Sequence, residues 1–213
     1  WAGTYPIGGL LQHGALRFGL PMLVIAPTVA AFRFPRYSRP ARLVALAVVG
    51  LSSIWALEAF LYVTFCYLGI VLIQVAWKEP GSRLRWLIRG TLYMVAAWVT
   101  VQVAFALITL IAYGSLPSWS LYLNYLRDFL AGDIGDLTYD FAVWSRGFAV
   151  AAIYLASVIG LYGLVTRLPE FASARRPAIV ALAGVTAYGI ALFSYYDNRS
   201  LDHVLPYVSL PAL

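Results

Sequence analysis

Long apolar runs alternate with short polar intervals along the chain, and their lengths fit membrane-spanning helices. A helix needs about 20 apolar residues to cross a bilayer. The run 43–77 is long enough for two helices, and a tight turn near Glu58 divides them. The complete spans are predicted at residues 14–32, 43–77 (two helices), 88–113, 141–166 and 178–196, and residues 204–213 open a seventh helix. The predicted fold is therefore an all-α polytopic bundle of about six full spans plus the start of a seventh.

The interval 114–140 is long and has a pattern of its own. Apolar and aromatic residues follow Pro117-Ser118 at helical spacing, and glycines at 132 and 135 end the pattern. The residues of this stripe are Trp119, Tyr122, Leu126, Phe129 and Leu130. The stretch is too short and too polar to cross a bilayer, so residues 118–131 are predicted to form an amphipathic helix lying in the membrane interface.

Small residues recur every four positions in two of the predicted spans. One set is Ala152, Ala156 and Gly160, and the other is Ala183, Ala187 and Ala191. Small side chains at this spacing let helix backbones approach closely in lipid. Both stripes are predicted to lie at contacts between helices.

The composition supports the membrane interpretation. The 213 residues are 62% hydrophobic and only 11% charged, which is more apolar surface than a soluble domain of this size can bury. Residues 1–213 are therefore predicted to form a single transmembrane domain. Because the chain begins at Trp1 and stops inside an apolar stretch, we expect it to be a piece of a longer membrane protein.

The charges are divided between alternate intervals, which sets an orientation. Most of the 15 Lys and Arg residues fall in intervals 33–42, 78–89 and 167–176, whereas most of the nine acids fall in the others. Basic loops face the cytoplasm, so the N-terminus of this segment and residues 114–140 and 197–203 are expected outside. The basic residues match an anionic leaflet rather than nucleic acid. Arginine far outnumbers lysine, which indicates a GC-rich coding sequence and hence a bacterial source. We therefore expect the protein in a bacterial inner (plasma) membrane.

The segment from Tyr195 to His203 is the densest polar cluster of the outer intervals. Its candidate binding residues are Tyr196, Asp197, Arg199, Asp202 and His203. An Arg guanidinium matches phosphate oxygens, and Tyr rings suit a sugar or a lipid headgroup. The alternative is an interfacial aromatic belt with a solvated turn.

Three further ionisable residues lie at predicted outer span ends. Arg17 and Arg146 sit inside spans, where a charge is costly and indicates a site, although both side chains could instead extend to the interface. Glu58 could face a cavity or water. The lone Cys66 lies in an apolar run and is expected in the core.

No motif indicates metal or nucleotide chemistry. The acids of the long outer interval match no calcium-loop spacing, and the chain contains no Walker A loop, His-Glu-x-x-His or cysteine pair. No metal site and no cofactor are predicted, with a divalent metal left open.

The end of the chain resembles a family. The sequence from Arg199 through Asp202, His203 and Pro206 to Pro211 is similar to the late outer turn of the GT-C superfamily of polytopic membrane glycosyltransferases. The resemblance implies an enzyme that transfers a sugar from a polyprenyl-phosphate donor at the outer face, with Arg199 and His203 holding the donor phosphate. In that family an acid in the first outer loop activates the acceptor. No such loop with paired acids is present, so the catalytic residue is unassigned, with Glu58 a weak candidate.

Other classes of membrane protein stay open. An O-antigen ligase or polymerase also handles lipid-linked sugars, a transporter or flippase would need polar residues near the midplane, and a non-catalytic subunit would need partner subunits. The expected partners are a lipid-linked sugar donor and membrane lipids.

Overall fold

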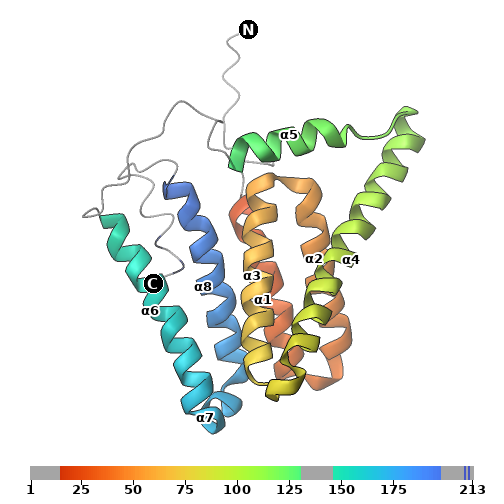
Figure 1. The fold of residues 1–213 in the computed structure, drawn as a ribbon. Helices are drawn as coiled ribbons and strands as arrows, with labels where there is room; N and C mark the ends of the chain where they lie inside the picture. The colour runs from red at the N-terminus through yellow and green to blue at the C-terminus, as the bar shows by residue number, and fades with distance from the viewer. Residues whose placement is uncertain (1–14, 131–145, 198–208, 210, 212–213) are drawn as a thin grey trace.

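A computed structural model of the chain describes residues 15–130, 146–197, 209 and 211, and within these residues the regular structure is entirely helical. The helices are α1 (Ala15–Arg33), α2 (Ser38–Trp55), α3 (Leu57–Ala76), α4 (Pro80–Tyr113), α5 (Trp119–Leu130), α6 (Arg146–Arg167), α7 (Pro169–Ala174) and α8 (Arg176–Asp197), with a short 3-10 helix η3 (Pro35–Tyr37) between α1 and α2 (Figure 1). The all-helical fold class predicted from the sequence is confirmed.

Local sequence explains where several helices begin and end. Pro80 and Pro169 open α4 and α7, where proline's missing N–H costs nothing. Gly114 ends α4 with φ 69, a backbone angle that favours glycine. Ala56, with φ −157 and ψ 145, separates α2 from α3. The predicted turn near Glu58 is therefore displaced by two residues, and Glu58 lies in the first turn of α3.

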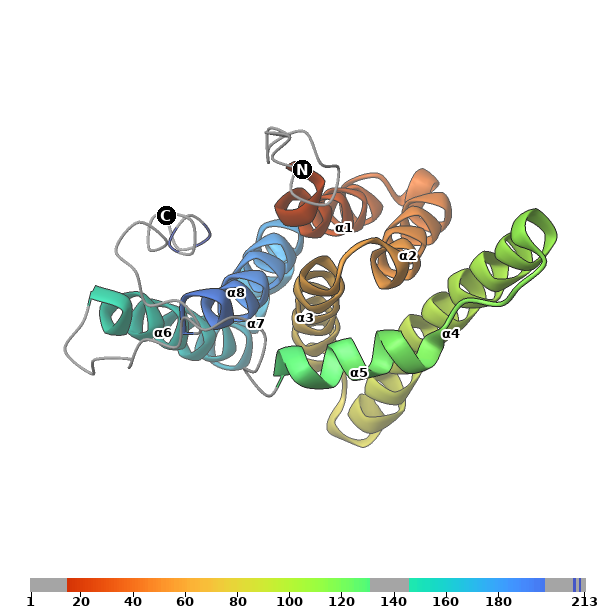
Figure 2. The ribbon, with the colours of Figure 1, turned by 90° about the horizontal axis from the view of Figure 1, so that it is seen from above.

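Helix α3 lies at the centre of the bundle. Its most extensive pairing is with α8, and it also contacts α1, α2 and α4, whereas α6 packs on the outer side of α8 (Figure 2). The core includes Tyr62, Val63, Cys66 and Ile70 of α3, all at most 2% exposed. The predicted place of Cys66 in the core is confirmed.

The two stripes of small residues have different outcomes. On α8, Ala183 and Ala191 are buried, and a Cβ at Gly69 of α3 would clash with the Ala187 side chain, so the prediction of close packing is confirmed there.

On α6 the prediction of close packing is wrong. Ala152, Ala156 and Gly160 are exposed, and a Cβ at Gly160 would meet nothing within 4 Å. Helix α6 contacts the bundle through another face, which carries Val150 and Tyr154. A small-residue stripe permits close approach but does not select which face is used.

The outer surface of the bundle is apolar. Leu92 and Ile111 of α4 and Leu155 and Ile159 of α6 are 61–85% exposed, which suits contact with lipid. Among the described residues, four helices are long and apolar enough to cross a membrane: α3, α4, α6 and the 176–193 part of α8. Residues 18–33 of α1 form a shorter apolar helix. The membrane-spanning character is supported, and the predicted seventh span falls mostly outside the described residues.

The bundle has two chemically different ends. The α1–α2 and α3–α4 connections and α7 lie at one end, whereas α5, the α2–α3 turn, the start of α6 and the end of α8 lie at the other (Figure 1). All three basic clusters of the sequence belong to the first end, here called the basic end; the second is called the α5 end. The three clusters thus lie at the same end of the bundle, as the charge pattern of the sequence predicts.

Candidate functional site

Most of the sequence-predicted site residues belong to the α5 end, but their side-chain geometry is outside the described part of the chain. Arg199, Asp202 and His203 follow α8 and are not among the described residues. Tyr196 and Asp197 are the last two residues of α8, and Arg17 is in the first turn of α1; for these three only the backbone is described. The elements that carry them end on the same side of the bundle (Figure 1).

Arg146 and Glu58 are described, and both lie at the α5 end. Arg146 is the first residue of α6 and is exposed. Glu58 is half-buried in the first turn of α3. They lie in the first turns of separate helices, α6 and α3, that start at this end of the bundle. The fold therefore places both residues at the same end.

Helix α5 crosses this end of the bundle (Figure 2), and long polar side chains tie it down. The Gln102 Nε2 of α4 donates to the Ser53 carbonyl of α2 at 3.0 Å, and the Gln102 Oε1 accepts from Trp119 Nε1 at 3.4 Å. The Tyr122 hydroxyl donates to the same Ser53 carbonyl at 3.3 Å. The first two aromatic residues of the predicted stripe therefore point at the bundle.

Burial of the Tyr122 side chain raises its pKa above the usual tyrosine value. The hydroxyl therefore keeps its proton throughout the neutral range and remains a donor to Ser53. Arg127 has a different role: its guanidinium pairs with the Asp128 carboxylate at 3.1 Å and is largely exposed.

The basic end contains cavities that were not predicted from the sequence. Two adjoining cavities, of about 280 and 420 Å³, share the lining residues Thr28, Arg42, Gln74 and Trp86. Lys78 and Arg176 add charge to the first, and Arg39 and Arg89 to the second. Together they are called the basic cavity. From the sequence, these cations were assigned only to contact with an anionic leaflet. The signal that could have indicated more is the presence of Trp77 and Trp86 among the basic residues of the interval 77–89.

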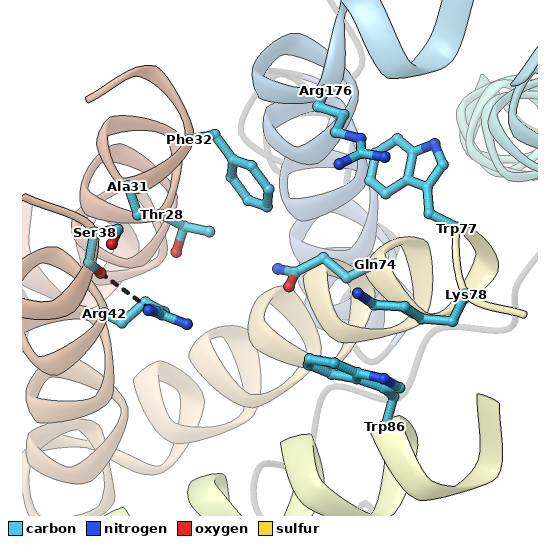
Figure 3. A pocket seen from close by; sticks show the side chains of 10 residues that line it. All are labelled: Thr28, Ala31, Phe32, Ser38, Arg42, Gln74, Trp77, Lys78, Trp86 and Arg176. Carbon is cyan, nitrogen blue, oxygen red and sulfur yellow. Dashed lines mark hydrogen bonds between the residues drawn. The ribbon is translucent and has the colours of Figure 1, made fainter. Parts of the chain in front are cut away.

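Contacts with aromatic rings and with a backbone carbonyl position three cations of the basic cavity. Lys78 Nζ lies 3.9 Å from the centre of the Trp86 ring, and the Arg176 guanidinium carbon lies 5.5 Å from that of Trp77. Arg42 is fixed by a 3.0 Å hydrogen bond from Nε to the Ser38 carbonyl. Figure 3 shows the charged ends of these side chains directed toward the cavity from α2, the α3–α4 turn and α8.

Within the described ranges, no group of three or more His, Cys, Asp or Glu side chains is arranged to hold a metal ion. The three outer aspartates at 133, 136 and 140 lie outside those ranges. Two regions of the described structure therefore gather polar side chains: the α5 end, where Gln102 and Tyr122 hydrogen-bond to Ser53, and the basic cavity.

No family model, curated protein or solved structure matches this chain.

Proposed function

We propose that this chain is the membrane part of a glycosyltransferase of GT-C type, which transfers a sugar from a polyprenyl-phosphate donor to an acceptor at the α5 end. In this proposal α1 and α2 also cross the membrane, giving six spans, and α5 lies in the interface. The α5 end faces the outside of a bacterial plasma membrane, as the distribution of Lys and Arg favours.

The observation that carries the proposal is the placement of α5. A lipid-linked donor has its phosphate at headgroup depth and its tail among the helices. An amphipathic helix tied across the bundle end by Trp119 and Tyr122 would cover such a headgroup and limit its contact with water. Helices α1, α6 and α8 bring Arg17, Arg146 and the polar segment that starts at Tyr196 to the same end.

The chemistry follows from the donor. Transfer breaks the bond between the anomeric carbon and the phosphate oxygen, forms a bond from that carbon to an acceptor hydroxyl, and leaves negative charge on the polyprenyl phosphate. Arg199 and His203 are proposed to stabilise that charge, with Tyr196, Asp197 and Asp202 lining the sugar. The proton of the acceptor hydroxyl passes to a base that remains unassigned; Glu58 is a weak candidate.

Sugar transfer from a polyprenyl-phosphate donor by the purified full-length protein tests the proposal. Arg199→Ala should lower the rate roughly tenfold to a hundredfold, since it removes a charged hydrogen bond of about 1.5–3 kcal/mol. Arg199→Lys should restore only part of the rate, because an ammonium cannot make the two-pronged contact.

The matched control is Arg85→Ala, which removes an exposed arginine from the basic end and should leave transfer unchanged. Wild-type rates in Arg199→Ala would remove that residue from the site. Absence of transfer by the wild-type protein across sugar donors and acceptors would reject the glycosyltransferase proposal.

A further inference from the structure

We propose that the basic cavity binds a phosphate group at headgroup depth, on the membrane side opposite to α5. This is a second ligand site, separate from the proposed sugar-transfer site at the other end of the bundle. It rests on the charge, the geometry and the size of the cavity.

The cavity concentrates positive charge that its own lining does not neutralise. Its cations among the described residues are Arg39, Arg42, Lys78, Arg89 and Arg176, and no Asp or Glu of the described part of the chain lines either cavity. The nearby acids Glu79 and Glu170 are exposed and line neither part. Like charges gathered from several elements repel one another, so a bound anion would stabilise the arrangement.

The cations are arranged by contacts that leave hydrogen-bond donors available. Lys78 and Arg176 rest on tryptophan rings, and a cation held by a ring face keeps its N–H groups for another partner. Arg42 uses Nε on the Ser38 carbonyl, which leaves its terminal nitrogens directed at the cavity (Figure 3). Gln74, half-buried between them, can donate through its amide.

Phosphate is the anion that fits this set of donors. Guanidinium groups match phosphate oxygens in a two-pronged geometry, and lysine adds a point charge. Helices α2 and α8 begin at Ser38 and Arg176, so the positive ends of their dipoles add to the potential. The two adjoining cavities, about 280 and 420 Å³, are of the size of small-molecule sites.

The phosphate could belong to an anionic lipid headgroup or to a free phosphate compound, and one experiment separates the two. Native mass spectrometry would count phosphatidylglycerol retained by the full-length protein taken from vesicles of phosphatidylglycerol and phosphatidylcholine. In parallel, the thermal midpoint would be measured in neutral detergent with and without inorganic phosphate. The test variant is Arg42→Gln with Arg176→Gln.

The matched control is Arg85→Gln with Arg167→Gln, which removes the same charge from exposed arginines outside the cavity lining. The single variants Arg42→Gln and Arg176→Gln keep the test valid if the double variant does not fold. Arg42 and Arg176 are themselves exposed, so each single substitution should leave the fold intact.

Phosphatidylglycerol retention at least about tenfold lower in the cavity variant than in the control would support a lipid phosphate. Stabilisation by inorganic phosphate that the cavity variant alone loses would support a free phosphate compound. Equal lipid retention in the cavity and control variants, together with no phosphate-dependent shift, would overturn the proposal and leave only a general attraction to the anionic leaflet.

Discussion

At the scale of single residues, Gly69 lies at a close contact that leaves no room for a side chain. Its Cα faces α8 so closely that an added methyl group would clash with the Ala187 side chain and lie 2.9 Å from the Ala183 carbonyl oxygen. The sequence revealed the α8 half of this contact through the spacing of its alanines. It could not reveal Gly69 as the partner, because nothing in local spacing tells which helix lies opposite.

Gly69→Ala should therefore destabilise the protein by about 1–3 kcal/mol, the usual cost of overfilling a tight contact. The measurement is thermal unfolding in detergent. Gly160→Ala is the control, since open space surrounds that position; it should be neutral or slightly stabilising because alanine favours helices. Equal midpoints for the two variants would contradict the close approach of α3 and α8.

At the scale of elements, the hydrophobic pattern located helices better than it located their ends. The span predicted at 88–113 is part of α4, which starts earlier, at Pro80. The apolar pattern marks only the part of a helix that lies in lipid, whereas α4 continues beyond that part through Arg83, Arg85 and Arg89. The short α7 was not predicted, since it falls in a basic interval. Helix α5 begins at Trp119, one residue after the predicted start at 118, and is described as far as Leu130; residue 131 lies outside the described residues.

Helix α5 is tied to the bundle by few contacts, so one of them is expected to control its motion. Gln102→Leu removes the amide that joins Ser53 of α2 to Trp119 of α5. We expect hydrogen exchange across 119–130 to rise about two- to twelvefold, corresponding to one net hydrogen bond of about 0.5–1.5 kcal/mol. Thr100→Val is the control, because Thr100 bonds only within α4, to Ala96.

The hydrogen bond from Tyr122 to Ser53 should be lost only at alkaline pH, when the tyrosine hydroxyl loses its proton. Because burial raises the folded-state pKa of Tyr122, its contribution is complete below the unfolded tyrosine value of about 10 and is lost as pH rises through the folded value. The protection factor of α5, which is the exchange rate corrected for the intrinsic pH dependence of amide exchange, should thus be constant across neutral pH. A fall in this protection factor on going to mildly acidic pH would contradict the assignment.

At the scale of the whole molecule, the alternation of basic and acidic intervals predicted that the three basic clusters lie at the same end of the bundle. The arrangement of the helices (Figure 1) agrees with that prediction. The basic cavity could not be predicted in the same way. Arg42, Lys78 and Arg176 are far apart in the sequence and become neighbours only through the packing of α2, α3 and α8. The polar segment at the end of α8 was chosen from its density of polar residues, and the resemblance added the donor-phosphate role of Arg199 and His203; the geometry of residues 198–203 lies outside the described residues.

Cysteine labelling from outside the cell tests the orientation. A cysteine replacing Asp136 should react, and one replacing Arg83 should be spared, because the first follows α5 and the second lies at the basic end. Cys66 is buried, so the background should be low. The reverse labelling pattern would invert the membrane orientation and reject an outward-facing sugar-transfer site.

The length of α4 has a consequence for the membrane itself. Its uncharged part, from Gly90 to Tyr113, is about 36 Å long at 1.5 Å per residue, whereas the hydrocarbon layer is about 30 Å thick. An upright α4 would leave apolar turns in water. The helix is inclined relative to α3 (Figure 1), and a tilt of roughly 35° would remove the mismatch. The packing of α4 against α2 and α3 fixes its inclination. This inclination brings the apolar length of α4 closer to the thickness of the bilayer and sets the position at which α5 begins.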